Sequence, residues 1–254
     1  MGTQQTMQAH VAEDLADRLS VIIHRFEQVA VIAHQAQPFA DVLKASGKCG
    51  QVELIAPPEN ETLNLAAHSY DAIFSLLDLH CVNDVPGYLA QCAKALKPDG
   101  LFMACFFAGD TLVELRETWL AAEAEFGGVS PRIAPMIGLR EMGGLLQRAG
   151  LALPVADADR LTVRYANVLS LLREIKALGY ANPLAQRHDG FTAPRLIGKL
   201  SENYRLDEDG RISATIELFW ALAWKPHESQ PKPKKPGSAT IRLEEILKKL
   251  DDEK

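Results

Sequence analysis

Acidic and imidazole side chains follow two apolar segments of the sequence, at the points where these segments end. Asp78 and His80 come directly after Tyr70–Leu77, and Asp110 follows Leu101–Phe107. Carboxylates and imidazoles exchange protons with substrates, so these three residues are the candidate catalytic groups, lining the substrate side of a site. Two of them also have a structural explanation, because Asp78 can form a turn and His80 can pack at a strand–helix junction.

The residues after Asp110 fit a helix start as well as a site. Thr111 and Glu114 have the spacing of a capping box, in which both side chains bind backbone N–H groups of the first helical turn. This pattern predicts a helix that opens at Thr111 and continues through Ala122. A role for Thr111 in lining a pocket remains the alternative.

Several other chemistries are excluded because the motifs that they need do not occur in the sequence. No serine–histidine–aspartate arrangement, H-E-x-x-H motif or phosphate-binding lysine loop occurs. The four cysteines lack C-x-x-C spacing and a histidine at ligand spacing, so we expect buried thiols and no metal site. A net charge of −6 argues against nucleic-acid binding. No apolar run reaches the ~18 residues of a membrane span, and the first residues lack a leader pattern, so we expect a cytoplasmic protein.

The candidate residues are positioned by alternating strands and helices. Unbroken apolar runs predict buried strands over Val29–Ala33, Val52–Ile55, Tyr70–Leu77, Leu101–Phe107 and Thr215–Trp224. Apolar residues spaced three or four apart predict helices over Val11–Phe26, Phe39–Ala45, a segment capped by Asp84, Arg140–Arg148 and Asn167–Leu178. The strand–helix–strand order from residue 70 to residue 107 is typical of an α/β fold with a parallel sheet.

The length and composition favour one main domain with a short extension. We expect a single domain over residues 1–225, with a helical insertion at about 165–205. Residues 226–254 form a separate C-terminal part, an extended proline-rich segment followed by a helix over Ile241–Leu250.

Three consecutive motifs resemble class I S-adenosylmethionine-dependent methyltransferases. They are Tyr70–Ser75, Leu79–Asp84 and Leu96–Leu101, which are similar to that superfamily's fourth strand, the following helix and the fifth strand. Gly109–Arg116, Gly128–Pro135, His227–Gln230 and Pro236–Thr240 are similar to a branch containing a mitochondrial complex I assembly factor described as an arginine hydroxylase. Methyltransferases of biotin-precursor synthesis resemble the chain more distantly. The resemblance implies a Rossmann-like, seven-stranded, mostly parallel sheet whose last strand is antiparallel.

The resemblance also implies S-adenosylmethionine as the cofactor, but two of its binding elements differ here. The superfamily places a glycine-rich loop after the first strand, whereas this chain has His34 and Gln35 and no glycine. After the second strand it places a carboxylate for the ribose, whereas this chain has Ala56-Pro57-Pro58 followed by Glu59. His34, Gln35, Glu59 and Leu77 are the candidate cofactor-binding residues, and we expect them to bind the cofactor weakly or not at all.

Two functions are compatible with these residues. In the first, the chain is a methyltransferase-superfamily enzyme that acts on a subunit of a respiratory complex. In the second, it is a non-catalytic protein of the same fold that binds a protein partner as an assembly or regulatory factor. Both predict a protein substrate or partner, and neither predicts an oligomeric state.

Overall fold

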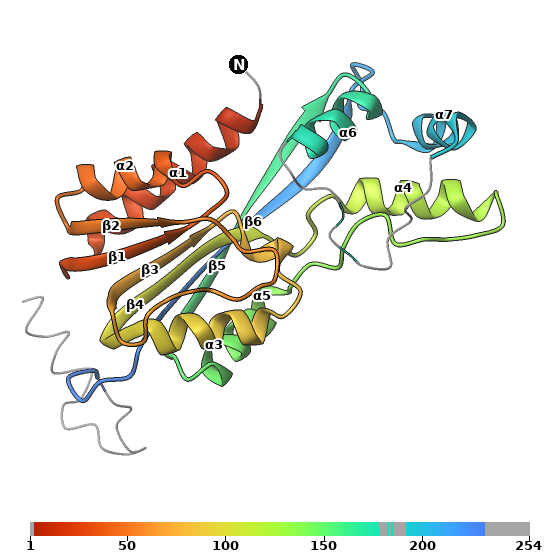
Figure 1. Ribbon diagram of the computed structural model, residues 1–254. Helices are drawn as coiled ribbons and strands as arrows, with labels where there is room; N and C mark the ends of the chain where they lie inside the picture. Colours follow the sequence, from red (N-terminus) through yellow and green to blue (C-terminus); the bar gives the residue numbers. More distant parts are fainter. Residues whose placement is uncertain (1–2, 178–181, 183, 185–191, 232–254) are drawn as a thin grey trace, which may run out of the picture.

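The described part of the chain, residues 3–177, 182, 184 and 192–231, forms one six-stranded sheet. The strands of this computed structural model are β1 (Phe26–Ile32), β2 (Cys49–Ile55), β3 (Tyr70–Leu76), β4 (Leu96–Phe107), β5 (Ala152–Tyr165) and β6 (Ile212–Trp224). They lie in the order β2-β1-β3-β4-β6-β5 (Figure 1). The first four are parallel, and β6 is antiparallel to β4 and β5. The predicted α/β fold with an antiparallel last strand is confirmed.

The predicted count of seven strands is wrong for the residues that the structure describes. Residues 56–69 join β2 to β3 without forming a strand, so β2 is an edge of the sheet. This segment begins with Ala56-Pro57-Pro58, and Thr62 is its single β-branched residue. Proline lacks the N–H that a sheet ladder requires, so the segment is poorly suited to form the missing strand.

Seven described helices cover the sheet and its extension. They are α1 (Thr3–Val21), α2 (Gln37–Ala45), α3 (Val85–Ala95), α4 (Val113–Ala124), α5 (Leu139–Arg148), α6 (Val168–Ala177) and α7 (Pro194–Asn203). Figure 1 shows α1 and α2 on one face of the sheet and α3 and α5 on the other. Each face has its own apolar core, with Leu15 of α1 and Phe74 of β3 in one and Leu89 of α3 and Ile73 of β3 in the other. None of the described helices combines the length and the apolarity needed to cross a bilayer.

The hairpin of β5 and β6 is longer than the rest of the sheet. Its far end extends toward α6, and α4 and α7 lie side by side next to it (Figure 1). Both α6 and α7 fall in the interval 165–205, where the sequence predicts helices. Of the predicted C-terminal part, the structure describes residues up to 231, and the helix predicted over Ile241–Leu250 lies outside the described residues.

Two elements differ from the sequence prediction. The first helix ends at Val21, and Phe26 opens β1 instead of closing that helix. Lys48 stabilises this earlier end because its ammonium group donates to the backbone carbonyls of Leu19 and Ser20, at 2.5 and 3.0 Å. Strand β5 was not predicted, because Pro154 and the alternating charged residues interrupt the apolar run that would indicate a strand.

Candidate functional site

Asp78 is buried at the carboxyl end of β3, with 1% of its surface exposed. The Tyr88 hydroxyl donates to Asp78 Oδ2 at 3.0 Å and also lies 3.0 Å from Ser75 Oγ. His34 Nε2, from the loop after β1, lies 3.9 Å from Asp78 Oδ1. Burial raises the pKa of Asp78 to about 6, although the Tyr88 hydrogen bond and the charge of His34 act in the opposite direction. The structure thus brings His34 and Asp78, two predicted site residues, together.

His80 lies in a short 3-10 helix, η1 (Leu79–Cys81), directly after Asp78. Its ring packs against the ring of Phe107 in a T-shaped arrangement, with 4.9 Å between the ring centroids. Desolvation by the surrounding protein, together with the charge of His34, lowers the pKa of His80 to about 3. The imidazole is therefore neutral at physiological pH. It faces a cavity together with Cys81 and Phe107.

Leu77 contributes its backbone conformation to this strand end. Its φ is +55°, a value uncommon for a residue with a side chain, and its N–H donates to the Cys105 carbonyl at 2.7 Å. Its side chain is buried in the same apolar core as that of Leu15. The turn that it makes leads the chain from β3 to the buried carboxyl of Asp78.

Asp110 lies on the surface and not among the residues that line the cavity. Its carboxylate forms an ion pair with Arg160 at 3.5 Å, and Arg160 also pairs with Glu217 at 3.0 Å. The backbone N–H of Asp110 donates to Glu217 Oε2 at 2.9 Å. These contacts join the end of β4 to the hairpin of β5 and β6.

The predicted capping box of Thr111 and Glu114 is wrong. The first helical turn of α4 follows Leu112, and no side chain caps it. Thr111 Oγ1 instead donates to the Ala108 carbonyl at 2.7 Å and accepts from the Glu217 N–H at 2.9 Å. The Glu114 carboxylate accepts from the N–H and the hydroxyl of Thr215. Thr111 and Glu114 have the spacing of a capping box, but their hydrogen bonds instead connect the start of α4 to β6.

The two strand ends expected to hold S-adenosylmethionine do not fit that cofactor in its usual manner. An open hollow lies at the ends of β1 and β2, lined by Ala33–Pro38 and Leu54–Ala56. Neither segment contains a glycine or a carboxylate. Pro38 stands in the first turn of α2 and removes one backbone donor there. This lining therefore lacks two features that the cofactor needs. It has no glycine to let backbone amides approach the ligand closely, and it has no carboxylate to bind the ribose hydroxyls.

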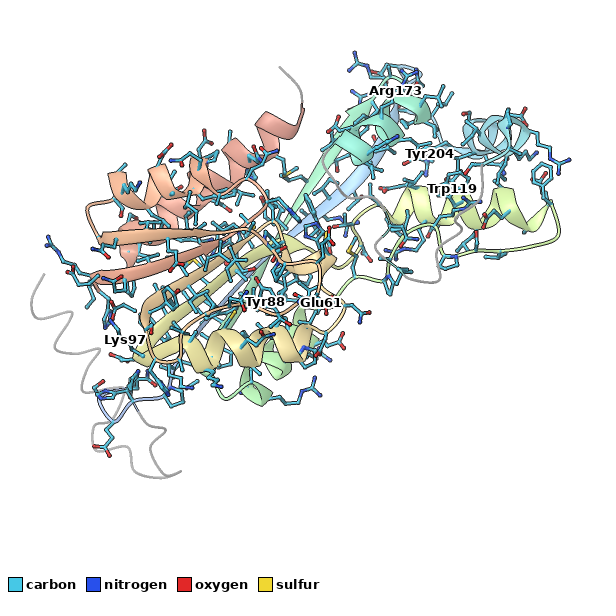
Figure 2. The ribbon with its side chains drawn as sticks, viewed as in Figure 1. Glu61, Tyr88, Lys97, Trp119, Arg173 and Tyr204 are labelled. Atoms are coloured by element: carbon cyan, nitrogen blue, oxygen red, sulfur yellow. The ribbon has the colours of Figure 1, made fainter. Side chains whose placement is uncertain are left out.

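Glu59, the predicted replacement for that carboxylate, is exposed in a turn. The neighbouring Glu61 is the acidic residue of this segment that makes hydrogen bonds to the rest of the chain. Its two carboxylate oxygens accept from the backbone N–H groups of Asn83 and Asp84, just before α3 (Figure 2). Glu61 therefore holds the segment after β2 against α3, on the side where Tyr88 reaches Asp78.

A cavity of about 120 Å³ opens beside the carboxyl ends of β3 and β4. Its walls come from the segments at the ends of β3 and β4, from α1, α4 and α6, from the loop between α4 and α5, and from the far part of the β5–β6 hairpin. The apolar lining residues are Met7, Phe107, Leu112, Leu115, Trp119, Ile133, Ala134, Met136, Val163, Leu171, Leu172, Ile175 and Ile216. A cavity with apolar and aromatic walls and few polar groups is typical of a ligand site.

Arg132 and Glu174 are the charged residues among the described lining of this cavity. Arg132 donates from Nε to Glu123 Oε1 at 2.6 Å, and its guanidinium lies 5.0 Å from the centre of the Trp119 ring. Hydrogen bonds from Ser130 and the pairing with Arg132 lower the pKa of Glu123 against the effect of its burial, so the Arg132 charge is compensated. Glu174 accepts from the Tyr165 hydroxyl at 3.2 Å.

The cavity brings together two sequence motifs that also carry the family resemblance. Thr111, Leu112 and Leu115 belong to Gly109–Arg116, and Arg132, Ile133 and Ala134 belong to Gly128–Pro135. These are two of the four segments that resemble the assembly-factor branch, so they offered a signal for this site. Trp119, Tyr165 and Glu174 carried no comparable signal and were missed.

Comparisons with known proteins agree with this architecture. Residues 21–104 match a family model described as a methyltransferase domain. The human protein named arginine-hydroxylase NDUFAF5, mitochondrial, is 36% identical over 220 residues, which are 84% of this chain and 63% of that protein. Malonyl-acyl-carrier-protein O-methyltransferase of Xylella fastidiosa is 30% identical over 205 residues, covering 80% of this chain and 68% of that enzyme.

The fold is shared with a solved structure as well. A protein from Bacillus halodurans, assigned as a methyltransferase, superposes with a TM-score of 0.54 at 12% identity, covering 85% of this chain and 99% of that one. The chain spans only 45–63% of the length of the mitochondrial arginine hydroxylases that it matches.

Proposed function

Because this chain belongs to the class I S-adenosylmethionine-dependent methyltransferase superfamily, we propose that its apolar cavity binds an arginine side chain of a protein substrate or partner. Open α/β sheets bind their ligands outside the carboxyl ends of the strands, and this cavity opens at that edge. The relatives named arginine hydroxylases suggest the side chain. A respiratory-complex subunit is the partner that the branch resemblance suggests.

The observation that carries the proposal is the placement of Glu174 within an apolar and aromatic wall. Its Oε1 accepts one hydrogen bond from Tyr165, and a carboxylate can accept about four. Since Glu123 compensates Arg132, Glu174 supplies the uncompensated negative charge among the described lining residues. An arginine has an aliphatic stem suited to the apolar wall and a cationic head suited to this carboxylate.

A fluorescence titration tests this proposal, because Trp119 lies in the cavity wall (Figure 2). The probe is the acetylated, amidated pentapeptide Gly-Gly-Arg-Gly-Gly. We expect a saturable change in tryptophan emission that is lost in Trp119→Phe and kept in Trp224→Phe, whose side chain lies outside the cavity. No saturable change, or an equal change in both variants, contradicts binding in this cavity.

Binding of the arginine is common to the enzyme and to the non-catalytic assembly factor. One observation favours the second candidate, namely the lining of the hollow at the ends of β1 and β2 without a glycine or a carboxylate. Calorimetric titration with S-adenosylmethionine separates the two, because tight binding supports an enzyme and its absence supports a binding protein. A cytoplasmic location stays a prediction, since the matched arginine hydroxylases are named as mitochondrial.

A further inference from the structure

Three potential metal ligands meet where α1 packs against β5, and none of them lines the hollow at the ends of β1 and β2. They are His10 and Asp14 of α1 and Asp159 of β5, and their ligand atoms all lie within 4.8 Å of one another. His10 and Asp14 are four residues apart on a helix, so they share one face. Asp159 approaches from the strand, with its Oδ2 3.0 Å from His10 Nε2. All three side chains are half-buried, which leaves room for solvent to complete a coordination shell.

The nearby cation does not neutralise this group. Arg18, one turn further along α1, forms two hydrogen bonds to Asp157, at 2.9 and 3.0 Å. Its guanidinium is therefore engaged by a carboxylate outside the group. The carboxylates of Asp14 and Asp159 are therefore the negative charges available to a cation in this group.

The orientation of Asp14 is fixed from outside the group. The indole N–H of the buried Trp220 donates to Asp14 Oδ2 at 2.8 Å. Hydrogen bonds of this kind commonly orient the carboxylates that bind metals. A carboxylate oxygen of Asp14 held in this way lies within 4.8 Å of the ligand atoms of His10 and Asp159.

We propose that His10, Asp14 and Asp159 bind a divalent zinc ion that links α1 to β5. One imidazole nitrogen and two carboxylate oxygens are a ligand set that zinc accepts, with water in the open position. The ion would take the place of the proton in the present contact between His10 and Asp159. The same two elements carry walls of the cavity, Met7 from α1 and Tyr165 from β5, so the ion would hold these walls together.

Calorimetric titration of the untagged, metal-stripped chain with zinc chloride tests the site. We expect one ion per chain, with an affinity at least about tenfold lower in His10→Ala and in Asp159→Asn. His24→Ala is the matched control, because His24 is a half-exposed histidine 3.8 Å from Asp99 and away from this group. Its affinity should equal that of the unmodified chain. Absence of saturable binding at millimolar zinc, or equal affinity in His10→Ala, would overturn the site.

Cobalt provides a second readout that locates the ion. A Co²⁺ ion bound to Asp14 would lie close to the Trp220 ring and quench its emission. We expect Trp220→Phe to lose most of the cobalt quenching, while Trp119→Phe keeps it. Equal quenching in both variants contradicts a site next to Trp220, even where zinc binding is observed.

Discussion

The hydroxyl of Tyr165 donates a hydrogen bond to Glu174 Oε1, 3.2 Å away, in the wall of an apolar cavity. Tyr165 closes β5 and Glu174 lies in α6, so this bond joins the end of the sheet to the insertion that follows it. The contact orients the carboxylate and leaves most of its acceptor capacity unused. A charged acceptor in such a wall favours a ligand that combines apolar bulk with a positive charge.

We predict that the chain binds S-adenosylmethionine weakly or not at all. The side chains that replace glycines would reduce the binding free energy by ~1–3 kcal/mol, about ten- to hundredfold in affinity, and the missing ribose carboxylate would reduce it by a similar amount. Together they would turn micromolar binding into millimolar binding, which calorimetric titration measures. A variant with glycines restored over residues 34–38 should bind more tightly only if the rest of the site is intact. A micromolar dissociation constant for the unmodified chain would falsify this prediction.

Asp78 should make the protein less stable as the pH rises from about 4 to about 6. Burial raises its pKa in the folded protein to about 6, from 3.8 in the unfolded chain. Between these values the folded state holds a proton that the unfolded state has released, so the free energy of unfolding falls as the pH rises. The full effect is about 3 kcal/mol at most. Asp78→Asn should flatten the dependence of the unfolding midpoint on pH across this window.

The matched control for that measurement is Asp110→Asn, which changes an exposed aspartate at another strand end. Chemical denaturation at several pH values gives the free energy of unfolding for each variant. An unchanged pH dependence in Asp78→Asn, or an equal change in Asp110→Asn, would show that Asp78 is not the group responsible.

Gly109→Ala should destabilise the protein by about 1–3 kcal/mol. Gly109 has a φ of +56°, and a Cβ atom there would lie 2.0 Å from Glu217 Oε2. That carboxylate is already bound to the Asp110 N–H and to Arg160, so it cannot move away without losing those contacts. Gly128→Ala is the control, because nothing lies within 4 Å of an added Cβ there. Equal unfolding free energies for the two variants would contradict the account of this turn.

The central strands and the helix between them could be predicted because their signals are local. Apolar runs define β3 and β4, and Asp84 caps α3 by accepting from the Gly87 N–H, as expected. Strand β5 could not be recognised from an apolar run. Among the described strands it pairs only with β6, at the edge of the sheet, and Asp157 and Asp159 on its α1 side interrupt the apolar pattern.

The sequence predicted only those residues of the candidate site that directly follow a strand. His34 and Asp78 meet because the carboxyl ends of parallel strands share one edge of the sheet. Thr111 was misassigned because its true partner, Glu217, lies 106 residues away along the chain. The cavity was missed for the same reason, since its walls combine residues from Met7 to Ile216. Spacing in the sequence records neighbours within one element and says little about contacts between distant ones.

The relative affinity for arginine and citrulline peptides shows whether the cavity recognises a cationic side chain. The pentapeptides Gly-Gly-Arg-Gly-Gly and its citrulline analogue have nearly the same shape and differ in charge. We expect the unmodified chain to prefer the arginine peptide by about tenfold or more. The control Glu117→Gln, altered on the exposed side of α4, should keep this preference. In Glu174→Gln the preference should fall to near equality. Equal affinity for both peptides in the unmodified chain, or an undiminished preference in Glu174→Gln, would contradict recognition of a cationic side chain by this cavity.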